Sequence, residues 1–363
     1  MLRSVGVEEE LLLVDPDSGQ ALALAAAVLD NAADGGQPVD QALTSELARQ
    51  QLETNTRPCA SLAELSAEVR RWRRAASEAA EGKGARIAAL GSSPLATEPS
   101  INSSPRYQRM VDEFGLIAEE QLTCGCHVHV EIDSESEGVA VLDRIRGWLP
   151  YLLALSANSP FWQGQDSGYA SFRSQVWGRW PSAGPTELFG SVETYHATTR
   201  AMIESRTVLD LGMVYFDARL SRQHPTVEVR VADVCLDADD AVLLGGLVRA
   251  LVDTAARSWR AGVPAAPIRT ELLRLTSWRA GRSGLDGDLV NPAGRPAPAA
   301  QVIRALVDHV RPVLDEYGDW EVIEDLVATV LSRGNGATAQ RRIYRTSGEL
   351  ADVVAYAADR TTA

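Results

Sequence analysis

The sequence predicts a single α+β domain over residues 1–363, with an antiparallel β-sheet and helices packed on one side of it. Segments with the two-residue alternation of strands and longer segments with helical periodicity both occur along the chain. The 363 residues are 45% hydrophobic, which is enough to bury a large core. Neither an internal repeat nor a low-complexity linker divides the chain, so one domain is the simplest arrangement.

The first half of the chain contains three predicted strands and two predicted helices. Ser4–Val14 is typical of a strand, and the turn signal in Asp15–Gly19 predicts a hairpin after it. Leu62–Gly82 has apolar residues at helical spacing, with Ser61 as a candidate N-cap. The remaining elements expected here are strands at Ile87–Leu90 and Thr123–Ile132, and a helix at Asp143–Ala157 that is interrupted at Pro150.

The second half begins with a long segment without periodicity, Asn158–Gly190, rich in Trp, Gly, Ser and Pro. Ordered loops of this length often carry function. The elements expected after it are a strand at Val227–Val234, helices at Ala238–Arg260, Ala300–Tyr317 and Trp320–Leu331, and a Gly/Pro-rich loop at Ser283–Pro298.

Charge and composition exclude several classes of protein. A net charge of −14 argues against a duplex nucleic-acid partner, and the chain contains no P-loop motif. Charged glutamates occupy the place where a signal peptide needs apolar residues, and no apolar run is long enough to span a bilayer. We therefore expect a cytoplasmic protein without membrane contact, in which the four cysteines are reduced packing residues.

Three consecutive glutamates form the first chemical motif, Gly6–Glu10. Side chains alternate faces along a strand, so Glu8 and Glu10 share one face and Glu9 points to the other. Two neighbouring carboxylates in a partly closed site require a cation, and their hard oxygen atoms favour Mg²⁺ or Mn²⁺. The alternative is a solvated edge strand.

Two further strands carry paired polar residues on one face. His127 and His129 share a face, an arrangement that also suits zinc and that occurs without any metal. Glu228 and Arg230 share a face as well. They form either an ordinary ion pair or a metal ligand beside a clamp for phosphate or carboxylate.

Two weaker motifs lie outside these strands. One is the run from Glu46 to Thr56, which contains Glu53. The other is the turn at 334–337, with Arg341 following it, which is also explained as the boundary of a helix.

Taken in order, these motifs resemble the type 2 glutamate–cysteine ligase family of carboxylate–amine ligases. They are GVEEE, QLETNT, TCGCHVHV, NSPFWQGQDSGYASFRSQVWGRWP, TVEVRVADV and GNGA, and they extend from about Val5 to about Arg342. The family is similar to glutamine synthetase. The resemblance therefore implies a funnel formed by the antiparallel sheet, with ATP entering at one end and the other substrate at the opposite end.

The resemblance also implies roles for individual residues. The expected ligands of two or three Mg²⁺ ions, with Mn²⁺ as an alternative, are Glu8, Glu10, Glu53, His127 and Glu228. Arg230 would contact the transferred phosphate, with Glu228 beside it as the second catalytic residue, and His129 and Arg341 would contact ATP. Arg173 and Arg179 are candidates for binding the α-carboxylate of the donor amino acid, or else they support a loop. Glu131 stands where the family has a glycine, and its role is open.

The function implied is an ATP-dependent ligase that joins the side-chain carboxylate of glutamate to an amine through an acyl phosphate. Cysteine is the acceptor suggested by the family name, and another amine is an alternative. Two other functions are to be weighed against the ligase: a metal-dependent hydrolase built on the histidines and glutamates, and an inactive relative that only binds a ligand. A symmetric homodimer is compatible with a chain of this size.

Overall fold

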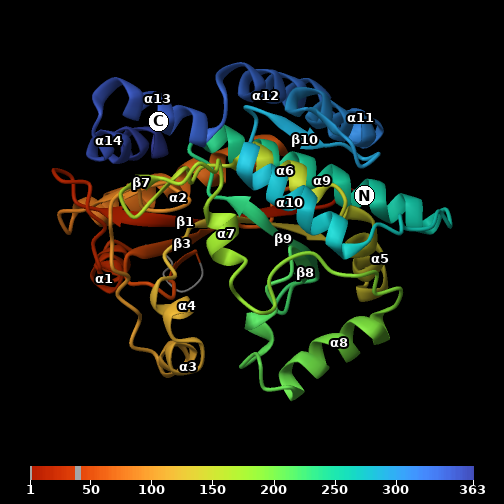
Figure 1. Cartoon of the computed structure of the whole chain (residues 1–363), viewed down its shortest axis with the longest axis horizontal. Coiled ribbons are helices and arrows are strands. Elements are labelled where there is room, and N and C mark those ends of the chain that lie inside the picture. The colour runs from red at the N-terminus through yellow and green to blue at the C-terminus, as the bar shows by residue number, and fades with distance from the viewer. Residues whose placement is uncertain (1, 37–41) are drawn as a thin grey trace.

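The computed structural model describes residues 2–36 and 42–363, and an antiparallel sheet forms the centre of this part of the chain (Figure 1). Its strand order is β2-β3-β1-β5-β9-β8, and β4 pairs with the second half of β1. Every pairing in the sheet is antiparallel, and the sheet does not close. The strands are β1 (Val5–Val14), β2 (Leu43–Ser45), β3 (Gln51–Asn55), β4 (Arg86–Ala88), β5 (Gly125–Glu131), β8 (Ala218–Leu220) and β9 (Thr226–Asp233).

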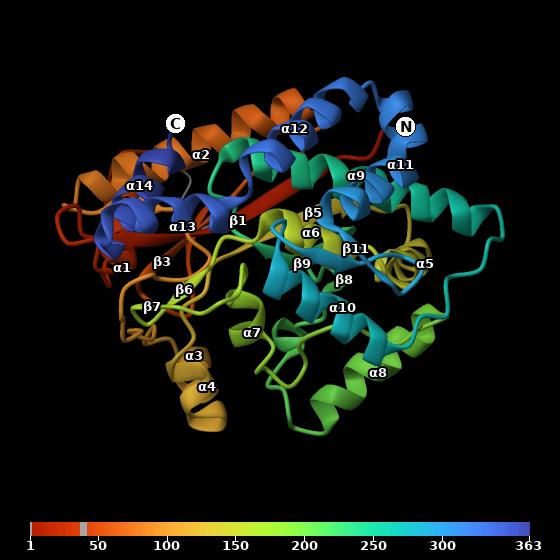
Figure 2. The same ribbon diagram turned by 45° about the horizontal axis from the view of Figure 1, so that its top comes forward.

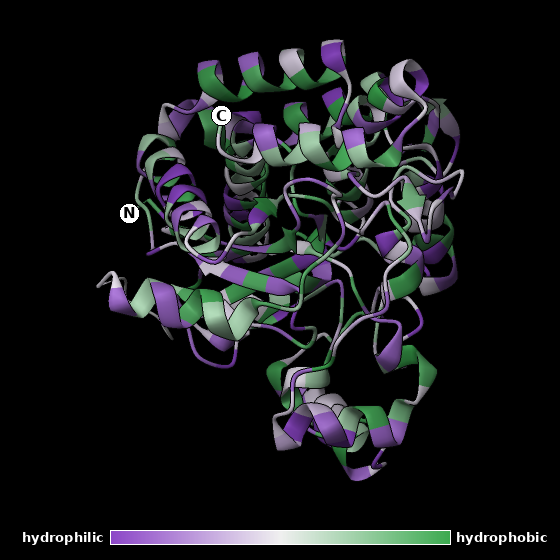
Figure 3. Cartoon of the chain, turned by 90° about the vertical axis from the view of Figure 1, so that its left-hand side faces the viewer, coloured by the Kyte–Doolittle hydropathy of each residue, from purple (hydrophilic) through white to green (hydrophobic). Residues whose placement is uncertain are grey.

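Helices cover one face of this sheet, as the sequence predicts. Apolar side chains of β1, β5 and β9 that alternate with polar ones, such as Val7, Val128 and Val229, form a buried core beneath them. Figure 3 shows hydrophobic and hydrophilic segments alternating along the helices, as in amphipathic helices that pack on a core. The main covering helices are α2 (Leu62–Glu81), α5 (Glu135–Ile145), α6 (Leu149–Ser156), α9 (Ala238–Arg260), α11 (Ala299–Tyr317) and α12 (Trp320–Arg333).

Local sequence signals explain where several of these helices begin. The Ser61 side chain accepts a hydrogen bond from the backbone N–H of Glu64, which caps α2. The predicted interruption near Pro150 is also present, because α5 ends at Ile145 and Pro150 lies in the first turn of α6. The segment predicted as one interrupted helix is therefore two.

The other face of the sheet is partly open. Short helices α3 (Pro105–Phe114), α4 (Leu116–Glu119) and α7 (Arg173–Trp177) and the 3₁₀ turn η1 (Leu211–Met213) stand beside it around a small core of their own. Figure 2 shows α3 and α4 on the opposite side of the sheet from α2 and α12, with α8 (Val192–Glu204) also on that side. Of these elements, α3, α7 and η1 contribute to the walls of the cavity described below.

Several helices were not expected from the sequence. α1 (Ala25–Asp34), α3, α8, α10 (Thr270–Ser283), α13 (Gly336–Ser347) and α14 (Leu350–Thr361) all lie in segments for which no helix was predicted. The irregular segments at 158–190 and 283–298 contain short hairpins, β6 (Phe161–Trp162) with β7 (Gln165–Asp166) and β10 (Asp288–Val290) with β11 (Pro296–Pro298). Strands of two or three residues are too short to show alternation, which is why they were missed.

None of the helices in the described part of the chain combines the length and the apolar character needed to cross a membrane.

Candidate functional site

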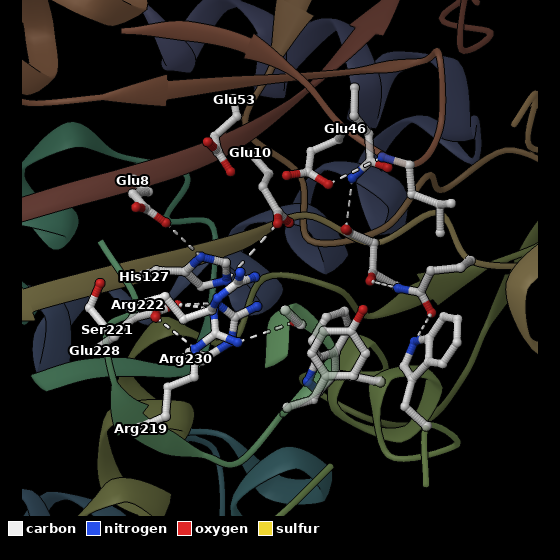
Figure 4. A pocket seen from close by; sticks show the side chains of 18 of the residues that line it. Glu8, Glu10, Glu46, Glu53, His127, Arg219, Ser221, Arg222, Glu228 and Arg230 are labelled. Carbon is white, nitrogen blue, oxygen red and sulfur yellow. Dashed lines mark hydrogen bonds and ion pairs between the residues drawn. The ribbon is translucent and has the colours of Figure 1, made fainter. Parts of the chain in front are cut away.

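A cavity of about 310 Å³ lies on the open face of the sheet. Figure 4 shows Glu8, Glu10, Glu46 and Glu53 on one side of it, and Glu228 beside Arg219 and Arg230 on the other. The walls include aromatic residues from α3, α7 and the segment before β8, among them Tyr107, Trp177 and Tyr215. Seven residues singled out from the sequence line this cavity: Glu8, Glu10, Glu53, His127, His129, Glu228 and Arg230.

The register of four neighbouring strands brings these residues together. On β1, Glu10 lies opposite Glu53 of β3, and Glu8 lies opposite His127 of β5. On the other side of β5, His129 lies opposite Glu228 of β9. Residues directly opposite each other in an antiparallel pair point to the same face, so the sheet presents all of them to the cavity.

Glu8, His129 and Glu228 form the first cluster able to hold a metal ion. Glu8 Oε1 lies 3.0 Å from His129 Nε2, and its Oε2 lies 3.1 Å from His127 Nδ1. Burial alone would raise the pKa of Glu8, but His129 and His127 outweigh it and hold that pKa well below its ordinary value. Burial would likewise lower the pKa of His129, and Glu8 outweighs it, so this pKa is raised. The cluster therefore favours an ionised carboxylate.

Two arginines neutralise Glu228. Arg219 forms a bidentate pair with this carboxylate, with nitrogen–oxygen distances of 2.7 and 3.0 Å, and Arg230 also contacts it. Burial raises the pKa of Glu228, but the arginines, Arg230 first, lower it to about 2 overall. The Arg230 guanidinium also lies over the rings of Trp177 and Tyr215, which fixes its orientation.

A β-bulge shapes the strand that carries Arg230. Val128 of β5 pairs with Val229 and Cys126 pairs with Ala232, so His127 faces two residues of β9 instead of one. Such bulges re-aim side chains beside functional sites. Here the two residues are Arg230 and Val231, so the bulge lies at Arg230 itself.

Glu10, Glu46 and Glu53 form the second cluster able to hold a metal ion. The backbone N–H of Gly125 donates to Glu10 at 2.5 Å, and Thr44 and Asn55 donate to Glu53. Burial and neighbouring carboxylates, Glu53 first, raise the pKa of Glu46 well above its ordinary value. Burial and Glu8 likewise raise the pKa of Glu53. This cluster brings three carboxyl groups together, and none of them forms an ion pair with an arginine or lysine of the described residues.

Both clusters fit divalent cations of the Mg²⁺ type. Within each cluster the candidate ligand atoms lie within 4.8 Å of one another. The second cluster offers oxygen atoms alone, which Mg²⁺ prefers. His127 Nε2 is buried without a hydrogen-bond partner among the described residues. A buried polar atom of this kind is available to contact a bound ion. Carboxylates that repel one another at this distance are the arrangement a bound cation stabilises.

The structure does not bring every predicted residue into this cavity. Arg179 pairs with Glu120 at 2.6 Å, and Arg341 pairs with Asp166 at 2.6 Å, both outside the cavity lining. Glu131 is exposed and accepts hydrogen bonds from Ser4. These three side chains contact partners far away in the sequence, which the alternation along a strand does not predict.

Arg173, a candidate either for binding the donor's α-carboxylate or for supporting a loop, does not line this cavity. It is 2% exposed and its guanidinium lies against Gly125, where an added Cβ would come within 2.2 Å of Nη2. It lines a second cavity instead of the first. Gly125 is thus required by the close approach of Arg173 behind the carboxylate-lined cavity.

A buried polar network explains two other motifs. The carboxylate of Asp233, which is fully buried, accepts hydrogen bonds from Asn158, Ser159 and Ser171. Asn335 caps α13, and the motif around it packs against Asn158, so the turn at 334–337 is a helix boundary that also ties the C-terminal segment to the sheet. These motifs support the site without facing the cavity.

Sequence reasoning missed several residues of the cavity. Glu46 belongs only to the weak run that ends at Thr56, and neither Arg219 nor Tyr215 belongs to any of the motifs, yet all three line the cavity. Arg219 lies opposite Glu228 on β8, so recognising the hairpin around Ser221–Pro225 would have identified it. Glu46 lies outside any strand, and no periodic signal marks it.

Comparisons with known proteins identify the family to which the sequence is similar. The model of the family described as glutamate-cysteine ligase family 2 (GCS2) matches residues 4–356. A protein of Streptomyces coelicolor that carries the provisional name glutamate–cysteine ligase 2 is 54% identical over 365 residues, covering 100% of both chains. A similarly named protein of Streptomyces avermitilis is 53% identical over 354 residues, which covers 97% of this chain and 98% of that one.

Solved structures with low sequence identity share the fold. A glutamate–cysteine ligase of Francisella tularensis in complex with AMP superposes with a TM-score of 0.71 at 14% identity, covering 100% of this chain and 89% of that chain. A bifunctional glutathione synthetase of Pasteurella multocida gives 0.70 at 16% identity, covering 99% of this chain and 52% of that chain. The predicted fold of helices on an antiparallel sheet is confirmed.

Proposed function

Because the chain belongs to glutamate–cysteine ligase family 2, we propose that it is an ATP- and Mg²⁺-dependent ligase that joins the side-chain carboxylate of glutamate to an amine. Family and fold together support an ATP-dependent ligase. The identity of both substrates and the route through an acyl phosphate belong to the proposal. We take residues 1–363 as one catalytic domain.

One observation carries the proposal: two carboxylate clusters and a fixed arginine face the same cavity. A ligase of this kind must bring a nucleotide triphosphate close to a substrate carboxylate, although both are anions. Bound Mg²⁺ ions would withdraw charge from the phosphate oxygens and so permit that approach. An acidic protein can then bind two acidic substrates, which reconciles the net charge of −14 with the function.

The protein's own residues have distinct roles in this proposal. Glu10, Glu46 and Glu53 would hold one cation, and Glu8, His129 and Glu228 would hold another, with His127 beside them. Arg230 contacts the transferred phosphate, because its guanidinium is held in the cavity wall by Glu228 and two aromatic rings. The sequence predicts that His129 contacts ATP, whereas in this proposal His129 is a metal ligand, because it lies in one cluster with Glu8 and Glu228.

The reaction has two displacements. An oxygen of the donor carboxylate attacks the γ-phosphorus of ATP, the bond to the bridging oxygen breaks, and ADP leaves. The neutral amine then attacks the carbonyl carbon of the acyl phosphate, inorganic phosphate leaves, and the nitrogen loses a proton as the amide forms. Arg230 stabilises the negative charge that develops on the phosphate in the first displacement.

The all-oxygen composition of the second cluster favours this function over a metal-dependent hydrolase. Catalytic zinc in proteins is typically held by at least one nitrogen or sulfur ligand, whereas Mg²⁺ takes carboxylate oxygens. A hydrolase would turn over amides or esters without a nucleotide. The same assay can therefore separate the two functions.

The test is ADP release with ATP, Mg²⁺ and glutamate against a panel of amines that includes cysteine, with mass spectrometry of the products. We expect a product with the mass of glutamate plus the amine less one water, formed one for one with ADP. The Glu8→Gln variant should lose this activity while it keeps its fold. Absence of ADP with every pair, or amide hydrolysis without ATP, would rule the proposal out.

A further inference from the structure

A second cavity of about 260 Å³ adjoins the first and is not used by the reaction described above. The two cavities share Trp177 and Arg230 in their linings. The second cavity lies between α6, α7, α10 and the end of β9. A molecule bound there would therefore lie next to the arginine that we assign to the transferred phosphate.

Asp217 supplies a carboxyl group to this second cavity. Its backbone is held on both sides, since its N–H donates to Gly184 and its C=O accepts from Arg230. Its carboxylate makes no hydrogen bond or ion pair within residues 2–36 and 42–363. Burial raises the pKa of Asp217 to about 7, and Arg274 only partly opposes this. A carboxylate that the protein leaves without a partner is suited to bind a cationic group of a ligand.

Arg274 supplies the opposite charge. It lies on α10, lines the same cavity and is exposed, and it forms no ion pair with the described residues. It is close enough to Asp217 to influence its pKa but too far away to pair with it. The second cavity thus holds a separated carboxylate and guanidinium.

Apolar and aromatic side chains form the rest of the wall. Leu153, Trp177, Phe216 and Trp278 line the cavity, and Trp278 is 41% exposed. Such a wall can pack against an apolar group of a ligand. Asp217 and Arg274 would then fix the orientation of that ligand. The first cavity, by contrast, is lined mainly by charged and polar side chains.

We propose that the second cavity binds the acceptor substrate, and that this acceptor is an α-amino acid with an apolar side chain, its ammonium group facing Asp217 and its carboxylate facing Arg274. The inference rests on the proposed ligase function and specifies the amine of that reaction. A zwitterion matches two separated charges of opposite sign, and a simple amine would leave Arg274 without a partner. The side chain of the amino acid lies against Trp177 and Phe216.

The experiment compares amino acids with the amines that lack only the carboxylate. Leucine is paired with isopentylamine and cysteine with cysteamine, and the acceptor KM is measured for the wild type, Arg274→Gln and Asp217→Asn. In Arg274→Gln we expect the preference for each amino acid over its amine to fall by about tenfold to hundredfold, because a charged hydrogen bond is lost. In Asp217→Asn we expect the KM of amino acid and amine to rise together. Arg269→Gln, at the exposed start of the same helix, and Asp308→Asn are matched controls.

Two further measurements separate failure of this inference from failure of the ligase function. Formation of glutamyl hydroxamate from glutamate, ATP and hydroxylamine tests the ligase reaction with a nucleophile too small to need the second cavity. No hydroxamate from the wild type would overturn the ligase function. Hydroxamate formation together with unchanged amino-acid preference in Arg274→Gln and Asp217→Asn would overturn the acceptor site. A raised KM for ATP instead of the acceptor would assign the cavity to the nucleotide and overturn it as well.

Discussion

Glu9 and Glu10 are consecutive residues of β1, yet the two faces of the sheet surround them differently. Glu9 lies under the helices, 2% exposed, and forms a bidentate pair with Arg73 at 2.6 and 2.9 Å. Arg73 also donates to backbone carbonyl groups of Cys235 and Leu236. Glu10 lies in the cavity beside two other glutamates, and it forms no ion pair with an arginine among the described residues. The comparison shows that Glu9 is paired for stability, whereas the cluster of Glu10, Glu46 and Glu53 keeps its carboxyl groups without an arginine partner and so available to a ligand.

The largest expected effect is a loss of stability when the buried pair of Glu9 and Arg73 on the helix-covered face is broken. Arg73→Met leaves the Glu9 carboxylate buried and unpaired, so the free energy of unfolding should fall by about 3–5 kcal/mol. Urea unfolding followed by circular dichroism measures it. The double variant Glu9→Leu with Arg73→Met should recover part of the loss, because no buried charge remains. Equal losses in the single and double variants would contradict this account.

The control for that prediction is a surface ion pair between β4 and α14. Arg86 pairs with Asp359 at 2.7 Å, and the Arg86 side chain is partly exposed while that of Asp359 is exposed. Arg86→Met should cost less than about 1 kcal/mol, as is usual for pairs in water.

The opposite pattern is expected on the cavity side. Glu53→Gln should lower the rate of ADP release by about 100-fold or more, because a preorganised charge is lost from the site. Its melting temperature without divalent cations should be equal to or higher than that of the wild type, because Glu53 no longer repels its neighbours. Glu78→Gln on the exposed face of α2 is the matched control. A large loss of stability in Glu53→Gln would show that the two faces do not differ in this way.

The next effect, somewhat smaller, is the stabilisation of the folded protein by Mg²⁺ bound on the cavity side. At a free concentration 100 times its Kd, Mg²⁺ should raise the free energy of unfolding by about 2.7 kcal/mol, because it binds the folded state. Thermal unfolding with MgCl₂ against NaCl of equal ionic strength measures it. The increase should be mostly lost in Glu53→Gln and retained in Arg86→Met. Equal stabilisation in both variants would place the ion elsewhere.

The smallest effect concerns an acid on the helix-covered side that is less well compensated than Glu9. Asp240 shares Arg333 with Asp237, and burial raises the pKa of Asp240 to about 6 from an ordinary value of 3.8. The folded state therefore holds this proton more tightly than the unfolded state does. Its contribution to stability is present below the ordinary pKa and is lost as the pH rises toward about 6.

This loss should amount to about 1–2 kcal/mol between acidic and neutral pH. Urea unfolding across that range should show a decline in the wild type that is smaller in Asp240→Asn. Asp239→Asn, at the neighbouring exposed position, should keep the wild-type decline. An identical decline in all three proteins would assign it to other groups.

The parts predicted well from the sequence were those in which a strand or helix pattern itself points the side chains. Alternation along β1, β5 and β9 placed Glu8, Glu10, His127, His129, Glu228 and Arg230 on shared faces, and the structure brings all of them into one cavity. The same logic predicted that Glu9 would point away from them. Arg179 and Arg341 were inferred without such a pattern, and their guanidinium groups pair with Glu120 and Asp166 outside the cavity.

The sequence by itself determined the fold class, the family and the face on which each strand residue lies, because period-two alternation and motif order are local properties of the chain. Only the tertiary structure decided which carboxylates become neighbours. Glu46, from a loop, joins Glu10 and Glu53, and Arg219 reaches Glu228 from β8. It also decided that Asp217 and Arg274 would face one cavity without pairing. Such contacts depend on strand register and on the packing of distant segments, and no single segment of the sequence contains that information.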